Sequence, residues 1–156
     1  MDQIIDAIAK TFDANQNQLD SALSYFDQIS DENFGHFVTN LVEIICLRET
    51  TLRNTSIVPF KLQACLQLKN VIHRKRERWL QFDHHLKEQI KASLISCFSL
   101  THVRSIGLAQ VVHVLAETEL HTNSWPQLIP SLLHLAADPG RNLDLRSMFY
   151  YDLIIL

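Results

Sequence analysis

Residues 58–74 read VPFKLQACLQLKNVIHR, and their pattern restricts the folds that the chain can adopt. Drawn as a helix, this stretch is apolar around most of its circumference. Its polar residues fall on one narrow stripe, at Gln63, Gln67, Asn70 and Arg74. A helix that is apolar on most sides must be covered by neighbours on most sides. We therefore predict a helix enclosed by other helices, with one line of polar residues left open.

The same pattern returns later in the chain. Residues 103–117 are mostly apolar around a polar stripe of Gln110, His113 and Glu117. Residues 17–28 have a narrower apolar side, as expected for an end helix that lacks one neighbour. Helices that start near positions 19, 58 and 103 recur with a period of about 40 residues, which is in the range of HEAT-type repeats. Stacked two-helix repeats of this kind leave the second helix of each pair on a concave surface.

Helical apolar spacing runs through the whole sequence, and no convincing alternating run indicates a strand. We predict eight helices, over residues 2–12, 16–29, 32–47, 58–78, 84–98, 102–118, 125–137 and 142–156. Residues 48–56 are predicted to be the longest loop. Side chains that could accept hydrogen bonds from a first helical turn precede most of the later helices. These predicted caps are Asp31, Ser56, Asp83, Thr101 and Ser124.

Length and composition limit the class of protein. The chain has 156 residues, of which 47% are hydrophobic and 20% charged, as in one globular domain or one segment of a repeat protein. The net charge of −3 does not indicate a polyanion as partner. The charge is uneven, however, because residues 1–50 sum to −7 and residues 61–91 to +5. The longest apolar stretch, Ile106 to Ala116, is too short to span a bilayer, so no membrane segment is predicted.

Motifs for metal binding and catalysis are missing from the sequence. His84 and His85 are adjacent and would point in different directions on a helix, and no His-x-x-x-His or Cys-x-x-Cys pair adds a second ligand. No nucleophile motif or phosphate-binding loop occurs, so we predict no enzyme, no catalytic residue, no metal and no cofactor. Cys46, Cys65 and Cys97 lie in apolar helical patterns and are expected to be reduced, buried thiols.

Two stretches resemble the N-terminal domain of the importin-β superfamily, the karyopherins, which are nuclear transport receptors. The first is Leu62–Ile72 followed by the basic run His73–Arg78 and by Trp79, similar to the family pattern A-x-x-L-K-N-x-I-x-R-x-W. The second joins Gln110–Glu117 to Ser124–Pro130, similar to a helix that ends in an acidic residue and is followed by W-P-e-L-l-p. The flanking helices match in order and spacing, so the resemblance spans nearly all of the chain.

The resemblance implies a right-handed α-solenoid of about four HEAT-type helical hairpins over residues 1–156, forming the N-terminal part of a longer solenoid. It implies that the inner helices bind the GTP form of the small GTPase Ran and that outer grooves bind Phe-Gly repeats of nucleoporins. Protein cargo would be held by repeats beyond this stretch. The implied location is the cytoplasm and the nucleus, including the pores of the nuclear envelope. The concave-face residues that we expect to contact the GTPase are Gln63, Gln67, Lys69, Asn70, Arg74, Gln110, His113 and Glu117.

Several features allow a second interpretation. Lys69 lies on the apolar side of its helix, where its stem could pack while its charge reaches a polar group, or it could contact the partner directly. Asn70 could bond neighbouring backbone instead of a partner. The run from Arg74 to Arg78 could bind nucleic acid, but such a run more often complements a helix C-terminus, which we favour. The alternative function is a HEAT-repeat scaffold for protein interactions without dependence on a GTPase.

Overall fold

The computed structural model describes residues 1–48, 51–52, 54–98, 105–119 and 124–137. Within these ranges the chain forms eight helices and one two-stranded hairpin. The helices are α1 (Asp2–Lys10), α2 (Gln16–Glu32), α3 (Phe34–Cys46), α4 (Val58–Arg74), α5 (Arg76–Leu80), α6 (His84–Cys97), α7 (Ser105–Glu119) and α8 (Leu128–Ala137). The strands are β1 (Thr51–Leu52) and β2 (Thr55–Ser56). The helix predicted over 142–156 lies outside the described residues.

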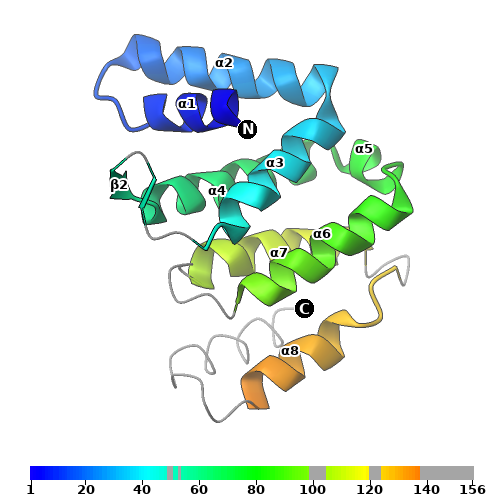
Figure 1. The fold of residues 1–156 in the computed structure, drawn as a ribbon. Helices are drawn as coiled ribbons and strands as arrows, with labels where there is room; N and C mark the ends of the chain where they lie inside the picture. Colours follow the sequence, from blue (N-terminus) through cyan, green and yellow to red (C-terminus); the bar gives the residue numbers. More distant parts are fainter. Residues whose placement is uncertain (49–50, 53, 99–104, 120–123, 138–156) are drawn as a thin grey trace.

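Consecutive helices pair as hairpins, and the hairpins stack in a row. α1 packs on α2 and α3 packs on α4, and across the row α4 packs on α7 while α3 packs on α6. α6 and α7 follow one another in the chain and form the next pair of the row (Figure 1). Figure 1 shows α3, α6 and α8 in one layer, with α4 and α7 in a second layer behind it. We call α3, α6 and α8 the outer layer. The prediction of an all-helical solenoid of stacked hairpins is confirmed.

The predicted helix over 58–78 is divided in two. Lys75, with φ −118° and ψ 41°, leaves the helical conformation and separates α4 from α5. The turn at Lys75 redirects the chain, and the Trp79 side chain of α5 is completely buried. Residues 48–56 were predicted as a loop, and here Thr51 and Leu52 pair with Thr55 and Ser56 in an antiparallel ladder. Asn54 sits in their turn at φ 62°, a conformation that asparagine tolerates better than most residues.

The helix caps agree with the sequence in part. Asp83 caps α6 by accepting a 2.9 Å bond from the backbone N–H three residues later, as predicted. Asp31 does not cap α3, because α2 continues to Glu32 and the cap is Asn33. The N-cap of α4 is Ile57 and not Ser56, although Ser56 Oγ accepts a 3.4 Å bond from the N–H of Val58. The predicted cap at Thr101 lies outside the described residues.

The core follows α4, which is covered by α3 on one side and by α7 on another. The buried apolar residues of α4 are Phe60, Ala64, Cys65, Leu68, Val71 and Ile72. On α7, Gly107 permits a close approach of α7 to α4, because a Cβ atom placed there would lie 3.2 Å from Leu62 Cδ2 and 3.4 Å from Cys65 Cβ.

No helix in the described part of the chain is both long and apolar enough to cross a bilayer.

The expectation of three reduced thiols is wrong for two of the cysteines. Cys46 and Cys97 form a disulfide, with their Cα atoms 5.7 Å apart. They are the last residues of α3 and α6, and the packing of these helices places the two ends opposite each other. Cys65 is a buried free thiol, and burial raises its pKa to about 12. Sequence reasoning missed the pair because 51 positions separate the two residues.

We expect Gly107→Leu to destabilise the fold by about 1–3 kcal/mol, because the added side chain would force α7 away from α4. Urea unfolding followed by circular dichroism measures this change. Ser24→Leu, at an exposed position of α2, is the matched control and should change stability by no more than about 0.5 kcal/mol. Equal urea midpoints for the two variants would contradict the close α4–α7 contact.

Candidate interaction face on the second helices

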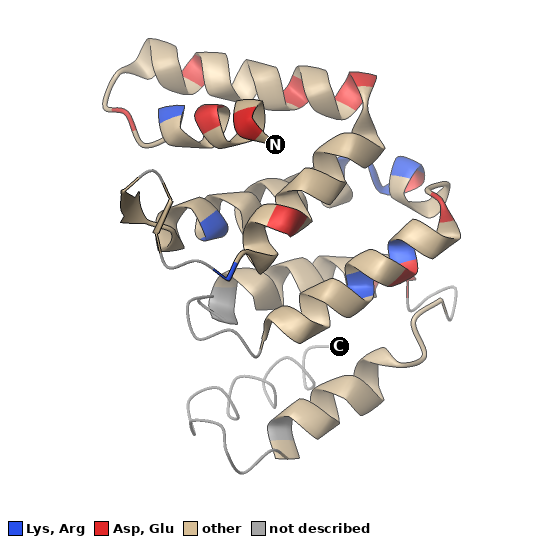
Figure 2. Ribbon diagram, in the orientation of Figure 1, with Lys and Arg blue, Asp and Glu red and all other residues tan. Residues whose placement is uncertain are grey.

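The predicted binding residues lie on α4 and α7, the second helices of their hairpins, and α2 is the second helix of the first hairpin. We call the polar side of α2, α4 and α7 the inner face. Charge is unevenly distributed along the row of helices. Figure 2 shows that acidic residues gather on α1 and α2, while basic residues occur on α4, α5 and α6.

Three predicted residues line one hollow between α2 and α4. This hollow has a volume of about 280 Å³. Its lining from α4 is Gln67, Asn70, His73 and Arg74, and its lining from α2 is Leu23, Phe26 and Asp27. The Arg74 guanidinium reaches across it, with Nη1 2.8 Å from Asp27 Oδ1. The sequence therefore identified one wall of the hollow and missed the wall that α2 supplies.

Gln67 departs from the expected open stripe. Its exposed fraction is only 5%, and it lines the hollow at the edge of α4 that faces α2. The exposed side of α4 is instead centred nearer Leu66, which is 41% exposed one helical turn before Asn70. Leu23 on α2 is similarly 42% exposed. The inner face thus includes two apolar side chains that a count of polar residues could not find.

Lys69 connects α4 to α7. Its Nζ lies 3.4 Å from Gln110 Oε1, and the residue as a whole is half-buried. The interpretation in which the stem packs and the charge reaches a polar group therefore describes this conformation, with a side-chain amide as the partner. Two residues predicted from separate helices are brought together by this contact.

The remaining predicted residues on this face differ in exposure. Gln63 and His113 are half-buried, and Glu117 is exposed near the end of α7. The backbone carbonyl of Glu117 accepts a 3.2 Å hydrogen bond from Arg76 Nη2. The end of α7 is thereby tied to the start of α5.

The basic run after α4 is used within the fold. Arg78 Nη1 donates to the carbonyl oxygens of Ser30 at 3.1 Å and Asp31 at 2.7 Å, near the C-terminus of α2. Lys75 Nζ donates to the Asp31 carboxylate, and this hydrogen bond lowers the pKa of Asp31. The preferred interpretation, in which the cations complement a helix C-terminus, is supported, but the helix is the neighbour α2 rather than α4.

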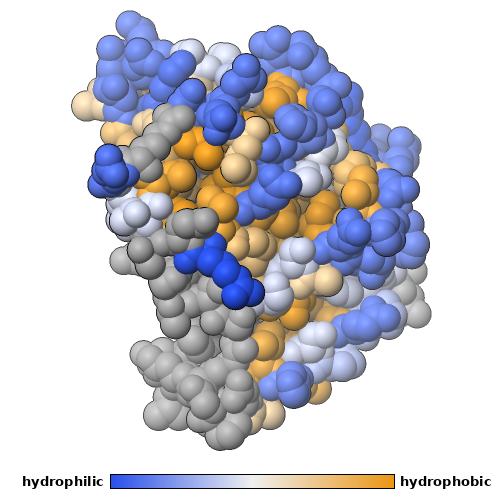
Figure 3. All heavy atoms as spheres, in the orientation of Figure 1, coloured by the Kyte–Doolittle hydropathy of each residue, from blue (hydrophilic) through white to orange (hydrophobic). Residues whose placement is uncertain are grey.

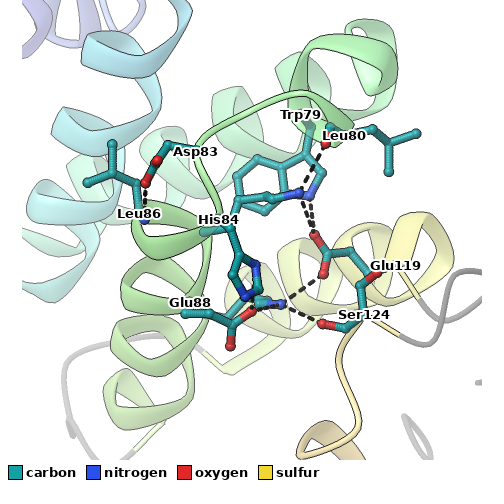
Figure 4. Close-up of polar contacts among 10 residues, drawn as sticks. Trp79, Leu80, Asp83, His84, Leu86, Glu88, Glu119 and Ser124 are labelled. Carbon is teal, nitrogen blue, oxygen red and sulfur yellow. Dashed lines mark hydrogen bonds and ion pairs between the residues drawn. The ribbon is translucent and has the colours of Figure 1, made fainter.

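A buried polar cluster fixes the end of α7 against α5 and α6. The carboxylate of Glu119 accepts from Trp79 Nε1 at 2.8 Å and from Lys91 Nζ at 2.8 Å (Figure 4). Lys91 Nζ also donates to the carbonyl oxygen of Ser124 at 2.9 Å. Lys87 Nζ donates to the carbonyl oxygen of Leu80 at 3.1 Å. These bonds join three helices and the segment that leads into α8.

Both charged partners in this cluster are almost fully enclosed, since the Lys91 and Glu119 side chains are 2% and 1% exposed. Glu88 provides a second carboxylate beside Lys91, and the Trp125 ring centroid lies 5.4 Å from Lys91 Nζ. Ser124 was predicted to cap the next helix, but α8 begins only at Leu128. No group of three or more metal-binding side chains occurs among the residues that the structure describes.

We expect Glu119→Gln to destabilise the protein by about 3 kcal/mol, because Lys91 would lose its most deeply buried counter-charge while Glu88 remains. Urea unfolding monitored by tryptophan fluorescence tests this. Asp27→Asn removes a carboxylate from the exposed Arg74 pair and should cost at most about 1 kcal/mol. A smaller loss for Glu119→Gln than for Asp27→Asn would show that the cluster does not hold α7.

Comparison with known proteins identifies sequence relatives and a solved structure with the same architecture. No family model matches the chain. Importin subunit beta-1 of Arabidopsis thaliana is 33% identical over 111 residues, which are 68% of this chain and 12% of that protein. Importin subunit beta-1 of Schizosaccharomyces pombe is 30% identical over 105 residues, 61% of this chain and 12% of the relative.

A crystal structure of importin beta in an ammonium sulfate condition has the same fold, with a TM-score of 0.79 at 18% identity. The superposition covers 97% of this chain and 18% of that one. The chain thus spans only a small part of the proteins that it matches. From its sequence relatives and its stacked helical hairpins, we conclude that the chain belongs to the importin-β, or karyopherin, superfamily.

Proposed function

We propose that this chain is a segment of a nuclear transport receptor and that its inner face binds the GTP form of a Ran-type small GTPase. The observation that best supports this is the meeting of predicted residues from separate helices. Lys69 and Gln110 connect α4 to α7, and Asn70 and Arg74 line a hollow that faces Asp27 on α2. Side chains on three successive second helices can therefore contact one folded partner.

The chemistry of the inner face suits a protein partner. It combines amide and charged side chains with the exposed leucines Leu23 and Leu66. Protein interfaces need such a mixture, because apolar contacts supply affinity while polar groups fix orientation. The Arg74–Asp27 pair is about half exposed on both sides, so either group can exchange its partner at low cost. We assign recognition, and not catalysis, to this face.

The other parts of the proposed function are inferred from membership of the importin-β superfamily. We propose that grooves between outer helices bind Phe-Gly repeats of nucleoporins and that cargo is bound by further repeats of the receptor. Movement between the cytoplasm and the nucleus through the nuclear pore is part of the same proposal. The basic run contributes little to nucleic-acid binding in this view, because Lys75 and Arg78 are engaged with α2.

We expect Ran loaded with a non-hydrolysable GTP analogue to bind the immobilised chain, and Ran loaded with GDP to bind at least about tenfold more weakly. Gln110→Ala and Arg74→Ala should each weaken binding of the GTP form by about fivefold, because each truncates one contact of about 1 kcal/mol. Titration calorimetry or surface plasmon resonance measures both effects.

Gln89→Ala is the matched control, since Gln89 is an exposed glutamine on α6 in the outer layer. It should leave GTPase binding unchanged, and circular dichroism should show equal helicity for all variants. Equal binding of both nucleotide forms would overturn the proposal in favour of a scaffold without GTPase dependence. Failure of either form to bind would overturn it as well.

A further inference from the structure

The disulfide between Cys46 and Cys97 joins neighbouring hairpins of the solenoid. Cys46 ends α3 and Cys97 ends α6, and these helices are adjacent in the outer layer (Figure 1). The bond therefore crosses from one hairpin to the next instead of closing a single hairpin. In a solenoid each hairpin contacts only its neighbours, so the spacing between neighbours determines how the array bends. A covalent bond on the outer side fixes that spacing there.

The two cysteine residues differ in accessibility. Cys97 is 1% exposed, whereas Cys46 is half-buried and lines a surface hollow of about 210 Å³ between α3 and α6. Val42, Leu86 and Ile90 form the apolar part of this hollow. Figure 3 shows hydrophobic surface between hydrophilic side chains on the face that carries the outer layer. A small oxidant or thiol can thus reach Cys46 from solvent, while Cys97 is protected.

We propose that Cys46 and Cys97 form a reversible, redox-sensitive disulfide. When oxidised it holds α3 against α6, and when reduced it lets the two hairpins move apart. This inference is independent of the proposed binding of a GTPase, but it rests on the proposed location of the chain in the cytoplasm and nucleus. Disulfides of proteins in reducing compartments are usually transient and redox-sensing, which is the behaviour assigned here.

We name a peroxide as the oxidant class, because a small oxidant can enter the hollow that Cys46 lines. The Cys46 thiolate attacks one oxygen of hydrogen peroxide, the O–O bond breaks, and a sulfenic acid and hydroxide form. The Cys97 sulfur then attacks the Cys46 sulfur, the S–O bond breaks, and water leaves as the S–S bond forms. Two thiols and one peroxide thereby give one disulfide and two waters.

Reduction starts at the same residue, Cys46. A small thiol attacks the Cys46 sulfur and releases the Cys97 thiolate, which takes up a proton. A second thiol then resolves the mixed disulfide and leaves Cys46 reduced. The carbonyl oxygen of Ser93, 3.7 Å from Cys46 Sγ, can accept the S–H of the reduced side chain. This hydrogen bond is available only to the reduced thiol, because a disulfide sulfur has no hydrogen to donate.

The first experiment identifies the bond. The full chain is treated with hydrogen peroxide or with dithiothreitol, alkylated under denaturing conditions, digested and analysed by mass spectrometry. We expect a Cys46–Cys97 cross-linked peptide only after peroxide, and two alkylated peptides after dithiothreitol. Cys65 should be alkylated in both samples, because it is buried and lies outside the pair. Links through Cys65, or no link, would overturn the proposal.

The second experiment tests whether the bond locks the hairpins. Amide hydrogen exchange is compared in the oxidised and reduced chain, and exchange at the C-terminal turns of α3 and α6 should be about tenfold slower in the oxidised chain. Cys46→Ser should remove this difference while leaving exchange in α1 and α2 unchanged. Cys65→Ala, the matched control, should preserve it. Equal exchange in the oxidised and reduced chain would overturn the mechanical part of the proposal.

Discussion

Burial of α4 between α3 and α7 is the constraint on which the rest of the structure depends. An α-helix with apolar residues around most of its circumference cannot be stable beside water, so each side must be covered. Packing α3 on one side and α7 on another satisfies this requirement and continues the row of hairpins. The side of α4 that remains open carries Asn70, Arg74 and the exposed Leu66, and this side becomes part of the inner face.

Polar contacts, some of them buried, set how the hairpins are arranged along the row. Arg78 bonds the last carbonyl groups of α2, and the Trp79–Glu119–Lys91 cluster joins α5, α7 and α6. The contacts of Arg78 with α2 and of Trp79 with Glu119 join different hairpins, whereas Lys91 and Glu119 join the two helices of one hairpin. The inner face is positioned by these links, because they hold the ends of α2 and α7 relative to α4.

Part of the candidate site was readable from the sequence. Asn70, Arg74 and Gln110 follow the helical period, and they lie where that period predicts. Gln67 and Lys69 required the tertiary structure, because they occupy the two edges of the α4 stripe, where α2 and α7 approach. The α2 residues Leu23 and Asp27 were missed as partners for a similar reason. A helical wheel describes one helix at a time and carries no information about which helices pack against it.

The sequence by itself determined that the chain is helical, that its helices stack as hairpins, and which side of α4 and α7 is polar. These properties follow from the spacing of apolar residues, which is local information. Only the tertiary structure decided that Cys46 meets Cys97, that Glu119 bonds Trp79 and Lys91, and that Arg74 reaches Asp27. Such contacts join residues far apart in the chain, and their geometry depends on how whole helices dock.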